Sequence, residues 1–237
     1  MKQKVAIGFP DGGSVSGAFA LSLVKLFKYE IENPIEEYEL LQPLRQSSLY
    51  IQNNRNELVL DAQFLKADWL FQIDGDHNFE PDLLRRLMKV GSLEKPIVVG
   101  LYSNISKAVG GSVVVVDCIY REVENGQYQT VSPPDNMQPF QVDAAGTGIF
   151  LTHMSVYDKV QFPWFWVELF QDPSKDRPQP MNEDIAFCRA ARSAGLPIWC
   201  DPSSEAEHLK TIPLLPSTMR KFLETAWATK EGMSNQG

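Results

Sequence analysis

Short apolar runs alternate with amphipathic stretches through the first hundred residues. Continuous apolar runs predict buried strands at Lys4–Phe9, Trp69–Ile73 and Pro96–Leu101, with a further strand between 38 and 52. Apolar residues that recur three and four positions apart predict helices from Gly17, over about 53–66 and after Pro81. Because strands and helices alternate along the chain, the pattern predicts a largely parallel sheet with helices on both faces.

The second half has shorter strand-like runs and more turn signals. Strands are predicted at 113–116, 118–124, 128–131, 142–151 and 196–200, and helices at 154–160, 183–194 and 217–229. Glu124-Asn125-Gly126 is a turn signal, so the strands on either side of it should form a small antiparallel hairpin. The stretch 167–180 is polar and rich in proline, has no apolar period, and predicts a mobile surface loop.

Composition narrows the classes of function. The 237 residues include 22 basic and 30 acidic side chains, a net charge of −8, which weighs against sequence-blind nucleic-acid binding but leaves room for a local basic groove. The three cysteines, Cys118, Cys188 and Cys200, are widely spaced and predict buried thiols in a reducing compartment. The first residues lack the pattern of a signal peptide and no apolar run reaches about 20 residues, so we expect a cytoplasmic protein without a membrane span.

The strongest local signal is Asp74-Gly75-Asp76, directly after a predicted buried strand. Ligands of open α/β sheets bind where strands end, and two carboxylates there suit a hard divalent cation shared with phosphates. An EF-hand starting at the first Asp would need Gly and Glu where the chain has Phe79 and Arg85, so that alternative fails. A P-loop fails too, because its lysine is absent between 8 and 17. An ordinary exposed turn is the competing interpretation.

Two later groups offer compatible chemistry. Asn182-Glu183-Asp184 begins a predicted helix, where carboxylates are either first-turn residues stabilised by the helix dipole or members of a reactive acidic pair. His208 follows an acidic stretch, and a neutral imidazole beside carboxylates is a good ligand for ions such as Mn²⁺.

The order of these motifs resembles the GT-A-fold glycosyltransferases, in particular the family-2-like enzymes of bacteria and phages. The resemblance covers roughly residues 4–210 and is carried by LFQIDGDHNFEPDLLRRLM (70–88), Asp143–Phe150, Phe162–Phe165, Glu183–Cys188 and His208. It implies an α/β fold, a Rossmann-like mixed sheet flanked by helices with a small antiparallel hairpin in the second half. It further implies a single domain over 1–237, made of a nucleotide-binding half (about 1–101), an acceptor and catalytic half (about 102–215) and a C-terminal helix and tail (about 216–237).

The resemblance also implies roles for individual residues. Asp184 would be the catalytic base, with Glu183 as the second candidate. The metal, Mn²⁺ or Mg²⁺, would be bound by Asp76 and His208. The donor would be bound by Pro10, Asp11, Arg55, Asp74, Gly146, Thr147 and Gly148. Trp164 and Trp166 would form part of the acceptor wall, although ordinary core packing explains them equally well.

The implied reaction is metal-dependent, inverting transfer of a sugar from a nucleotide sugar, with a UDP-sugar favoured, to an acceptor hydroxyl. The acceptor would be a glycan, a protein or a modified DNA base. Phage relatives that glycosylate hydroxymethylated bases make the last an alternative, and a phage-encoded chain would act in the host cytoplasm. A nucleotidyltransferase is disfavoured because 8–20 contains no basic residue for a triphosphate. A non-catalytic module that binds sugar nucleotides is the third alternative.

Overall fold

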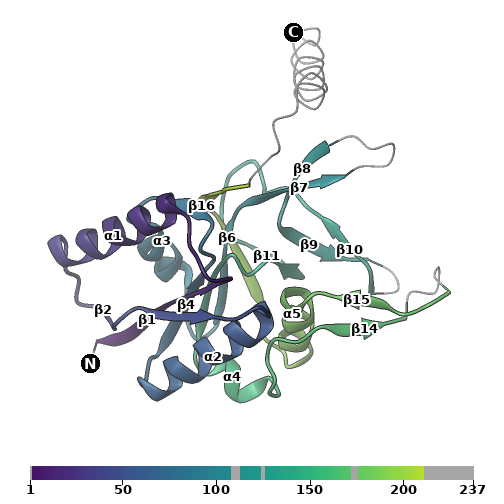
Figure 1. The fold of residues 1–237 in the computed structure, drawn as a ribbon, viewed down its shortest axis with the longest axis horizontal. Coiled ribbons are helices and arrows are strands. Elements are labelled where there is room, and N and C mark those ends of the chain that lie inside the picture. Colours follow the sequence, from purple (N-terminus) through teal and green to yellow (C-terminus); the bar gives the residue numbers. More distant parts are fainter. Residues whose placement is uncertain (1, 108–112, 124–125, 172–175, 211–237) are drawn as a thin grey trace, which may run out of the picture.

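A nine-stranded mixed sheet forms the centre of the molecule (Figure 1). The computed structural model describes residues 2–107, 113–123, 126–171 and 176–210. The strand order is β11-β16-β6-β13-β4-β1-β2, with β3 also paired to β1 and β5 to β16. The strands are β1 (Gln3–Asp11), β2 (Tyr38–Leu40), β3 (Leu44–Ser47), β4 (Trp69–Ile73), β5 (His77–Phe79), β6 (Ile97–Leu101), β11 (Phe140–Val142), β13 (Ile149–His153) and β16 (Ile198–His208). The helices are α1 (Gly17–Glu32), α2 (Ile51–Phe64), α3 (Leu83–Val90), α4 (Val156–Lys159) and α5 (Glu183–Ser193).

Most pairings in the central sheet that involve β1 or β6 are parallel. β1 is parallel to β2, β3 and β4, and β6 is parallel to β16. β13 from the second half lies between β4 and β6 and is antiparallel to both. The predicted mixed α/β sheet flanked by helices is therefore confirmed, and the inserted β13 is what makes the sheet mixed. The carboxyl ends of β1 and β4 meet at one edge, because those two strands are parallel neighbours.

Helices cover both faces of the sheet, each over its own apolar core. Side chains of β4 alternate between the faces: Leu70 packs with the core beneath α2, α4 and α5, whereas Trp69, Phe71 and Ile73 pack with the core beneath α1 and α3. Figure 1 shows α1 and α3 on one side of β1 and β4, with α2 and α4 on the other. Because both faces are buried, four of the five residues of β4 are apolar, and the exception, Gln72, is buried as well.

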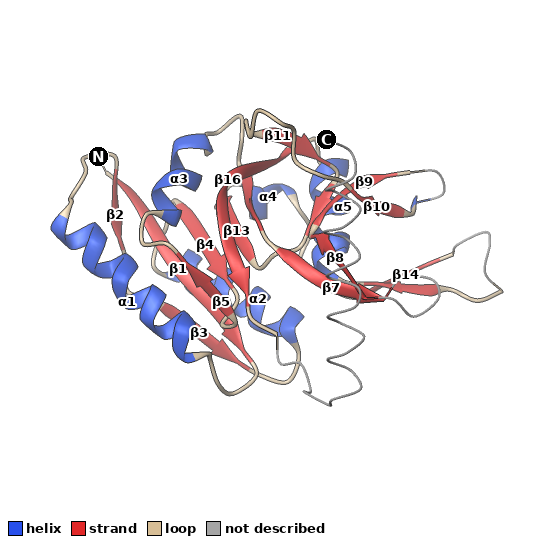
Figure 2. Cartoon of the chain, turned by 90° about the horizontal axis from the view of Figure 1, so that it is seen from above, coloured by secondary structure: helices blue, strands red, loops and turns tan. Residues whose placement is uncertain are grey.

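Short antiparallel ribbons project from the second half, on the side away from α1 (Figures 1 and 2). They are β7 (Ser103–Lys107) with β8 (Val113–Asp117), β9 (Ile119–Glu122) with β10 (Tyr128–Thr130) and β12 (Ala144–Ala145), and β14 (Glu168–Phe170) with β15 (Gln179–Met181). The predicted hairpin is confirmed, since Tyr128 pairs with Glu122. The prediction of a loop over 167–180 was wrong at both ends, because β14 and β15 pair there despite the polar, proline-rich sequence.

Other predicted boundaries also differ from the structure. The stretch 142–151 is divided among β11, β12 and β13: Asp143 separates the first two strands, and Gly146-Thr147-Gly148 separates the last two. The last strand does not end at Cys200 but continues to His208, through a register shift between Asp201 and Glu205. The predicted C-terminal helix at 217–229 lies outside the described residues. All three cysteines are buried and free, as predicted. In the described part of the chain, no helix has both the length and the apolar character needed to cross a membrane.

Candidate functional site

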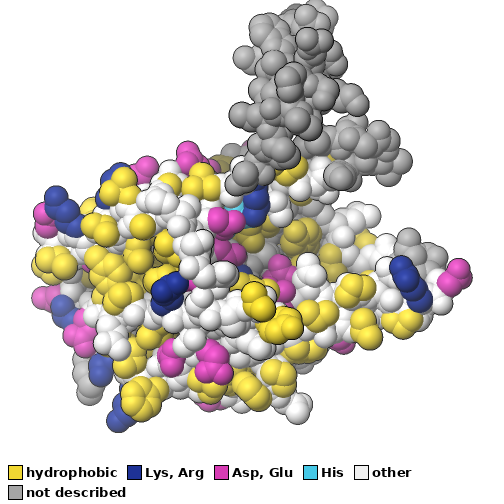
Figure 3. All heavy atoms as spheres, in the orientation of Figure 1, with side chains coloured by type: hydrophobic (Ala, Val, Ile, Leu, Met, Phe, Trp, Pro, Cys, Tyr) yellow, Lys and Arg dark blue, Asp and Glu magenta, His cyan; other side chains and the backbone are white. Residues whose placement is uncertain are grey.

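A cleft of about 500 Å³ opens at the edge where β1 and β4 end. Predicted residues from both strand ends line it: Pro10, Asp11, Asp74 and Asp76. The remaining lining residues are Gly12, Ser14, Val15, Ser16, Ser48, Leu49, Ile51, Asn54 and Gly75. Figure 3 shows acidic side chains around a hollow in the middle of this face, with a histidine and a basic side chain at its edge. The fold thus brings together groups that are more than 60 residues apart in the sequence.

The turn Asp74-Gly75-Asp76 is fixed by its neighbours. The Asp74 N–H donates to the Gly148 carbonyl at 3.0 Å, and the Gly75 carbonyl accepts from the Ser16 N–H at 2.8 Å. A Cβ at Gly75 would lie 2.7 Å from Val15 Cγ1, closer than side chains normally approach. A glycine between the two carboxylates is therefore required by the close approach of the loop between β1 and α1.

Asp76 lies in a cluster of possible metal ligands with two histidines. His208 Nε2 is 3.1 Å from Asp76 Oδ2, and His77 Nδ1 is 3.2 Å from Asp76 Oδ1, the latter without hydrogen-bond geometry. The ligand atoms of the three side chains lie within 4.8 Å of one another. His208 Nδ1 lies 3.0 Å from the Ser103 carbonyl, which can only accept, so Nδ1 carries a proton. Two of these residues, Asp76 and His208, were predicted from the sequence, and His77 was missed.

His77 is fully buried between aromatic rings. Its ring stacks on His208 with centroids 4.6 Å apart and an interplanar angle of 11°, and it meets Tyr102 edge to face at 4.8 Å. Neither ring nitrogen has a hydrogen-bond partner among the described residues. A buried polar side chain normally has a partner, so the unpaired ring nitrogens make His77 a candidate metal ligand. The signal available in the sequence was its position directly after the Asp74-Gly75-Asp76 motif.

One ammonium group and two imidazole rings surround the Asp76 carboxylate. Burial alone would raise its pKa, but the hydrogen bonds from His208 and Lys210, together with the close His77 ring, outweigh burial and hold the pKa well below its ordinary value. Lys210 Nζ is 3.1 Å from Asp76 Oδ2, the same oxygen that faces His208. The carboxylate is thus strongly predisposed to remain ionised beside a cation.

Arg55 connects the strand-end carboxylates to the acidic pair of α5. Its side chain is 3% exposed; Nη2 donates to Asp74 Oδ1 at 2.9 Å and Nη1 to the Thr147 carbonyl at 3.2 Å, while Nε lies 3.6 Å from Glu183 Oε1. Burial lowers the pKa of the guanidinium, but the charges of Asp74 and Glu183 outweigh burial and raise it. Arg55 is not among the residues that line the cleft, so the structure does not place it against a donor base or phosphate.

Asp184 has a raised pKa of about 6. Burial is the largest cause and the neighbouring charge of Glu183 the next, while the Ile185 N–H, which donates to Asp184 Oδ1 at 2.7 Å, and Arg55 act in the opposite direction. Both acidic residues lie in the first turn of α5, where the helix dipole favours carboxylates. A carboxyl group that titrates close to neutral pH is suited to accept a proton during catalysis.

Asp11 is engaged within the protein. Its Oδ2 accepts from Arg45 Nε at 2.6 Å and its Oδ1 from the Gly13 N–H at 2.7 Å, and only 1% of its side chain is exposed. The hydrogen bond from Arg45 is the main reason why the pKa of Asp11 falls to about 2. The Asp11 carboxylate therefore shapes the wall of the cleft, and its oxygens are already bonded.

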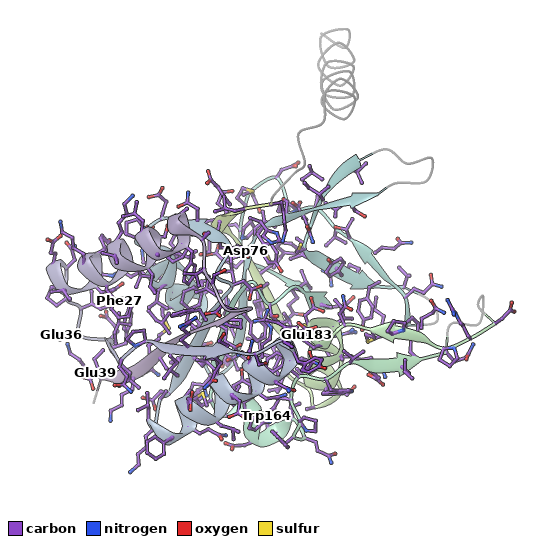
Figure 4. All side chains as sticks on the ribbon, in the orientation of Figure 1. Phe27, Glu36, Glu39, Asp76, Trp164 and Glu183 are labelled. Carbon is purple, nitrogen blue, oxygen red and sulfur yellow. The ribbon has the colours of Figure 1, made fainter. Side chains whose placement is uncertain are left out.

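The predicted glycines and tryptophans have different surroundings. A Cβ at Gly146 would overlap Tyr102 Oη, and one at Gly148 would lie 2.8 Å from His77 Cε1. Packing alone therefore accounts for both glycines, and their predicted contact with a donor stays a prediction. The Trp164 indole is buried and donates to the carbonyls of Tyr157 and Val160, so the core packing alternative holds for Trp164, not an acceptor wall. Figure 4 shows Trp164 beside α4, away from Asp76 and Glu183.

A second hollow of about 500 Å³ lies along α1. Apolar side chains such as Leu23 and Phe27 line it together with Lys28 and Glu32. Phe27 lies far from Asp76 and Glu183 in Figure 4, and no predicted site residue borders this hollow. The carboxylates, the histidines and Arg55 all belong to the region of the first cleft.

Comparisons with known proteins support the fold of this chain but not a function. No protein-family model and no curated protein matches the chain. A solved structure described as the crystal structure of A197 from STIV is similar, with a TM-score of 0.51 and 16% identity, over 88% of this chain and 87% of that one. At this level of identity the similarity shows a shared mixed α/β architecture over most of both chains. What the site does must be argued from its own residues.

Proposed function

We propose that this protein is a metal-dependent glycosyltransferase of the GT-A type, which moves a sugar from a nucleotide sugar to an acceptor hydroxyl with inversion. The observation that carries the proposal is the cluster of Asp76, His77 and His208, of which Asp76 lines the cleft. The second part is the Asp184 carboxyl group with a pKa of about 6, on which Arg55, bonded to the cleft residue Asp74, also acts. A divalent cation ligand set and a candidate proton acceptor are the two chemical parts that such a transfer needs.

The residues present fit a divalent cation. His208 is held by the Ser103 carbonyl through Nδ1, which leaves Nε2 directed at Asp76, the usual arrangement of a metal-binding histidine. The two N···O separations, 3.1 and 3.2 Å, are close to the ~3 Å expected between adjacent ligands at about 2.1 Å from one ion. Two imidazoles and one carboxylate favour a transition ion such as Mn²⁺ over Mg²⁺, which prefers oxygen ligands.

The cleft is suited to a nucleoside diphosphate sugar, with a UDP-sugar as the first candidate. It is lined by Pro10, Val15 and Leu49, which offer apolar surface to a nucleobase, and by the carboxylates of Asp74 and Asp76. A bound divalent ion would stabilise the negative charge that develops on the leaving diphosphate. Asp74 accepts from Arg55 through Oδ1, and it would also accept a hydrogen bond from a ribose hydroxyl.

Asp184 would be the base of the transfer. The acceptor oxygen forms a bond to the anomeric carbon, the bond from that carbon to the phosphate oxygen breaks with its electron pair leaving on the diphosphate, and the hydroxyl proton passes to Asp184. General-base assistance of this kind typically contributes about 10²–10⁴-fold to the rate. Glu183 lies next to Asp184 in the first turn of α5 and is held near Arg55 instead.

A panel of nucleotide sugars with and without Mn²⁺ tests the proposal. A donor present at about 100 times its Kd should stabilise the protein by roughly 2.7 kcal/mol in a thermal-shift assay, and only when Mn²⁺ is present. Asp76→Asn should lose the Mn²⁺-dependent part, while Asp184→Asn should still bind the donor but neither hydrolyse it nor transfer its sugar. Donor hydrolysis needs no acceptor, so the assay does not depend on knowing one. Release of pyrophosphate from nucleoside triphosphates, or full activity of Asp184→Asn, would instead contradict the assignment.

A further inference from the structure

Arg55 joins two acidic groups that come from distant parts of the chain. From α2 its guanidinium contacts Asp74 at the end of β4, the Thr147 carbonyl before β13 and Glu183 at the start of α5. Its side chain is 3% exposed, and Nε has no hydrogen-bond partner among the described residues. The group is therefore fixed on two of its three nitrogens and directs the third at Glu183.

Glu183 and Asp184 are adjacent in sequence but lie in different surroundings. Glu183 Oε1 is 3.6 Å from Arg55 Nε. Asp184 bonds to the Ile185 N–H, and its charge acts on Tyr102, Cys118 and Tyr120, from the β6–β7 connection, the β8–β9 connection and β9. These three groups are neutral at pH 7, so they supply no counter-charge. The cation close to the acidic pair lies on the side of Glu183.

One guanidinium lies among three carboxyl groups, those of Asp74, Glu183 and Asp184. Carboxyl groups that share a low-dielectric site cannot all ionise with equal ease, and the one farthest from a positive charge keeps its proton to the highest pH. Asp74 and Glu183 have the direct ion pairs with Arg55. The geometry thus distinguishes the two members of the acidic pair: Glu183 is paired with Arg55, and Asp184 has no ion pair among the described residues.

We infer that Arg55 is a positioning residue of the acidic pair: its guanidinium holds Glu183 by an ion pair and acts by its charge on Asp184, which has no ion pair with it among the described residues, so that Asp184 is the member that accepts the proton. The inference rests on the proposed function. It replaces the donor-binding role that the sequence suggested, because Arg55 does not line the cleft. It also gives the start of α5 and the donor carboxylate Asp74 a common anchor.

A measurement that needs no activity tests this role first. In protein labelled with ¹³C at aspartate carboxyl carbons, the Asp184 signal is assigned by its loss in Asp184→Asn and titrated with pH. Arg55→Gln should raise the pKa of Asp184, by about one unit, because an opposing charge is removed. Glu183→Gln should lower it, because a like charge is removed. The double variant should titrate above Glu183→Gln, which measures the effect of Arg55 in a second background that leaves no unpaired glutamate.

An unchanged Asp184 titration on removal of Arg55, in both backgrounds, would overturn the inference. If Arg55→Gln alone does not fold, the comparison of Glu183→Gln with the double variant still decides it. Arg55→Lys retains the charge but cannot make three contacts at once, so it should leave the titration near that of the unchanged protein.

Kinetics separate positioning from donor binding. Arg55→Gln should lower kcat at least about tenfold and move the acidic limb of the pH–kcat profile upward, with a donor Kd changed less than about threefold. Arg45→Gln is the matched control, since it removes a guanidinium bonded to Asp11 at the cleft, without contact to the acidic pair; its acidic limb should not move. A large loss of donor affinity with an unmoved limb in Arg55→Gln would contradict the inference. If the unchanged protein neither transfers nor hydrolyses any donor, the proposed function fails while the NMR result still stands.

Discussion

At the scale of single residues, the raised pKa of Asp184 suits proton transfer but lowers the stability of the folded protein at alkaline pH. Its pKa of about 6 in the folded protein lies above the ordinary value of 3.8, so folding favours its protonated form. The stability that the protonated Asp184 contributes is complete below about pH 4 and is lost as the pH rises through 6. At pH 8 the ionised carboxylate should therefore destabilise the fold by about 1–3 kcal/mol.

Asp184→Asn should therefore raise the free energy of unfolding at pH 8 and leave it nearly unchanged at pH 4. Urea unfolding at the two pH values measures the difference. Asp135→Asn is the matched control, because Asp135 is exposed in a loop, and its effect should be small at both values. Equal effects of Asp184→Asn at pH 4 and pH 8 would show that Asp184 titrates normally.

The residue types of the site could be predicted from the sequence, but their partners could not. Asp74, Asp76 and Glu183 follow local patterns, a strand end and a helix start, and local patterns are visible in one sequence. Arg55 lies on a polar helix, where an arginine is ordinarily solvated. In the structure its side chain is buried by contacts with residues distant in the sequence, among them Glu183, 128 positions later. Burial of a charge depends on tertiary packing, for which the sequence pattern of α2 gives no sign.

At the scale of elements, Tyr102 determines which residues the loop between β12 and β13 can contain. Its Oη accepts from the Gly148 N–H at 3.3 Å, and its ring meets His77 and His208 edge to face. The loop backbone passes so close to this ring that neither Gly146 nor Gly148 has space for a Cβ. The loop, the ring and the histidines are consequently one packed unit beside the cleft.

Gly146→Ala should destabilise the protein by about 1–3 kcal/mol, the usual cost of overpacking a rigid contact. Adding Tyr102→Phe to Gly146→Ala should recover part of that loss, because the overlapping hydroxyl is gone. Gly12→Ala is the control: a Cβ there meets nothing within 4 Å, so its effect should stay within about 0.5 kcal/mol. Thermal unfolding of the four proteins measures these differences, and a Gly146→Ala protein as stable as Gly12→Ala would contradict the packing explanation.

Strand pairing limits what could be predicted about the metal cluster. The main strands and the β9–β10 hairpin follow continuous or alternating apolar patterns and were predicted. β16 continues past Cys200 through Asp201-Pro202, where polar residues and a proline hide the strand. Its last residues pair with β5, so that His208 lies opposite His77. Without that register the sequence gives no reason to connect the two histidines.

At the scale of the whole molecule, the net charge of −8 conceals a local balance at Asp76. Asp76 follows β4 in the first half of the chain, whereas the ammonium of Lys210, which offsets its charge, and the ring of His208, which bonds to it, come from the end of the described chain. The pairing of β16 with β5 brings these groups together. Total charge is therefore a poor guide to what binds at this edge.

Lys210 should compete with a divalent cation for Asp76. Its ammonium lies 3.1 Å from Asp76 Oδ2, on the same oxygen that faces His208 Nε2, so a cation bound by both residues must displace it. Lys210→Met should therefore tighten Mn²⁺ binding, by up to about fivefold, since a pair this exposed is worth about 0–1 kcal/mol. Isothermal titration with MnCl₂ measures the affinity. Lys89→Met is the matched control because it makes the same change of charge on α3, at an exposed lysine that has no ion pair with Asp76 in the described part of the chain. An equal gain in both variants would mean that only the overall charge matters, whereas a gain confined to Lys210→Met places the cation at Asp76.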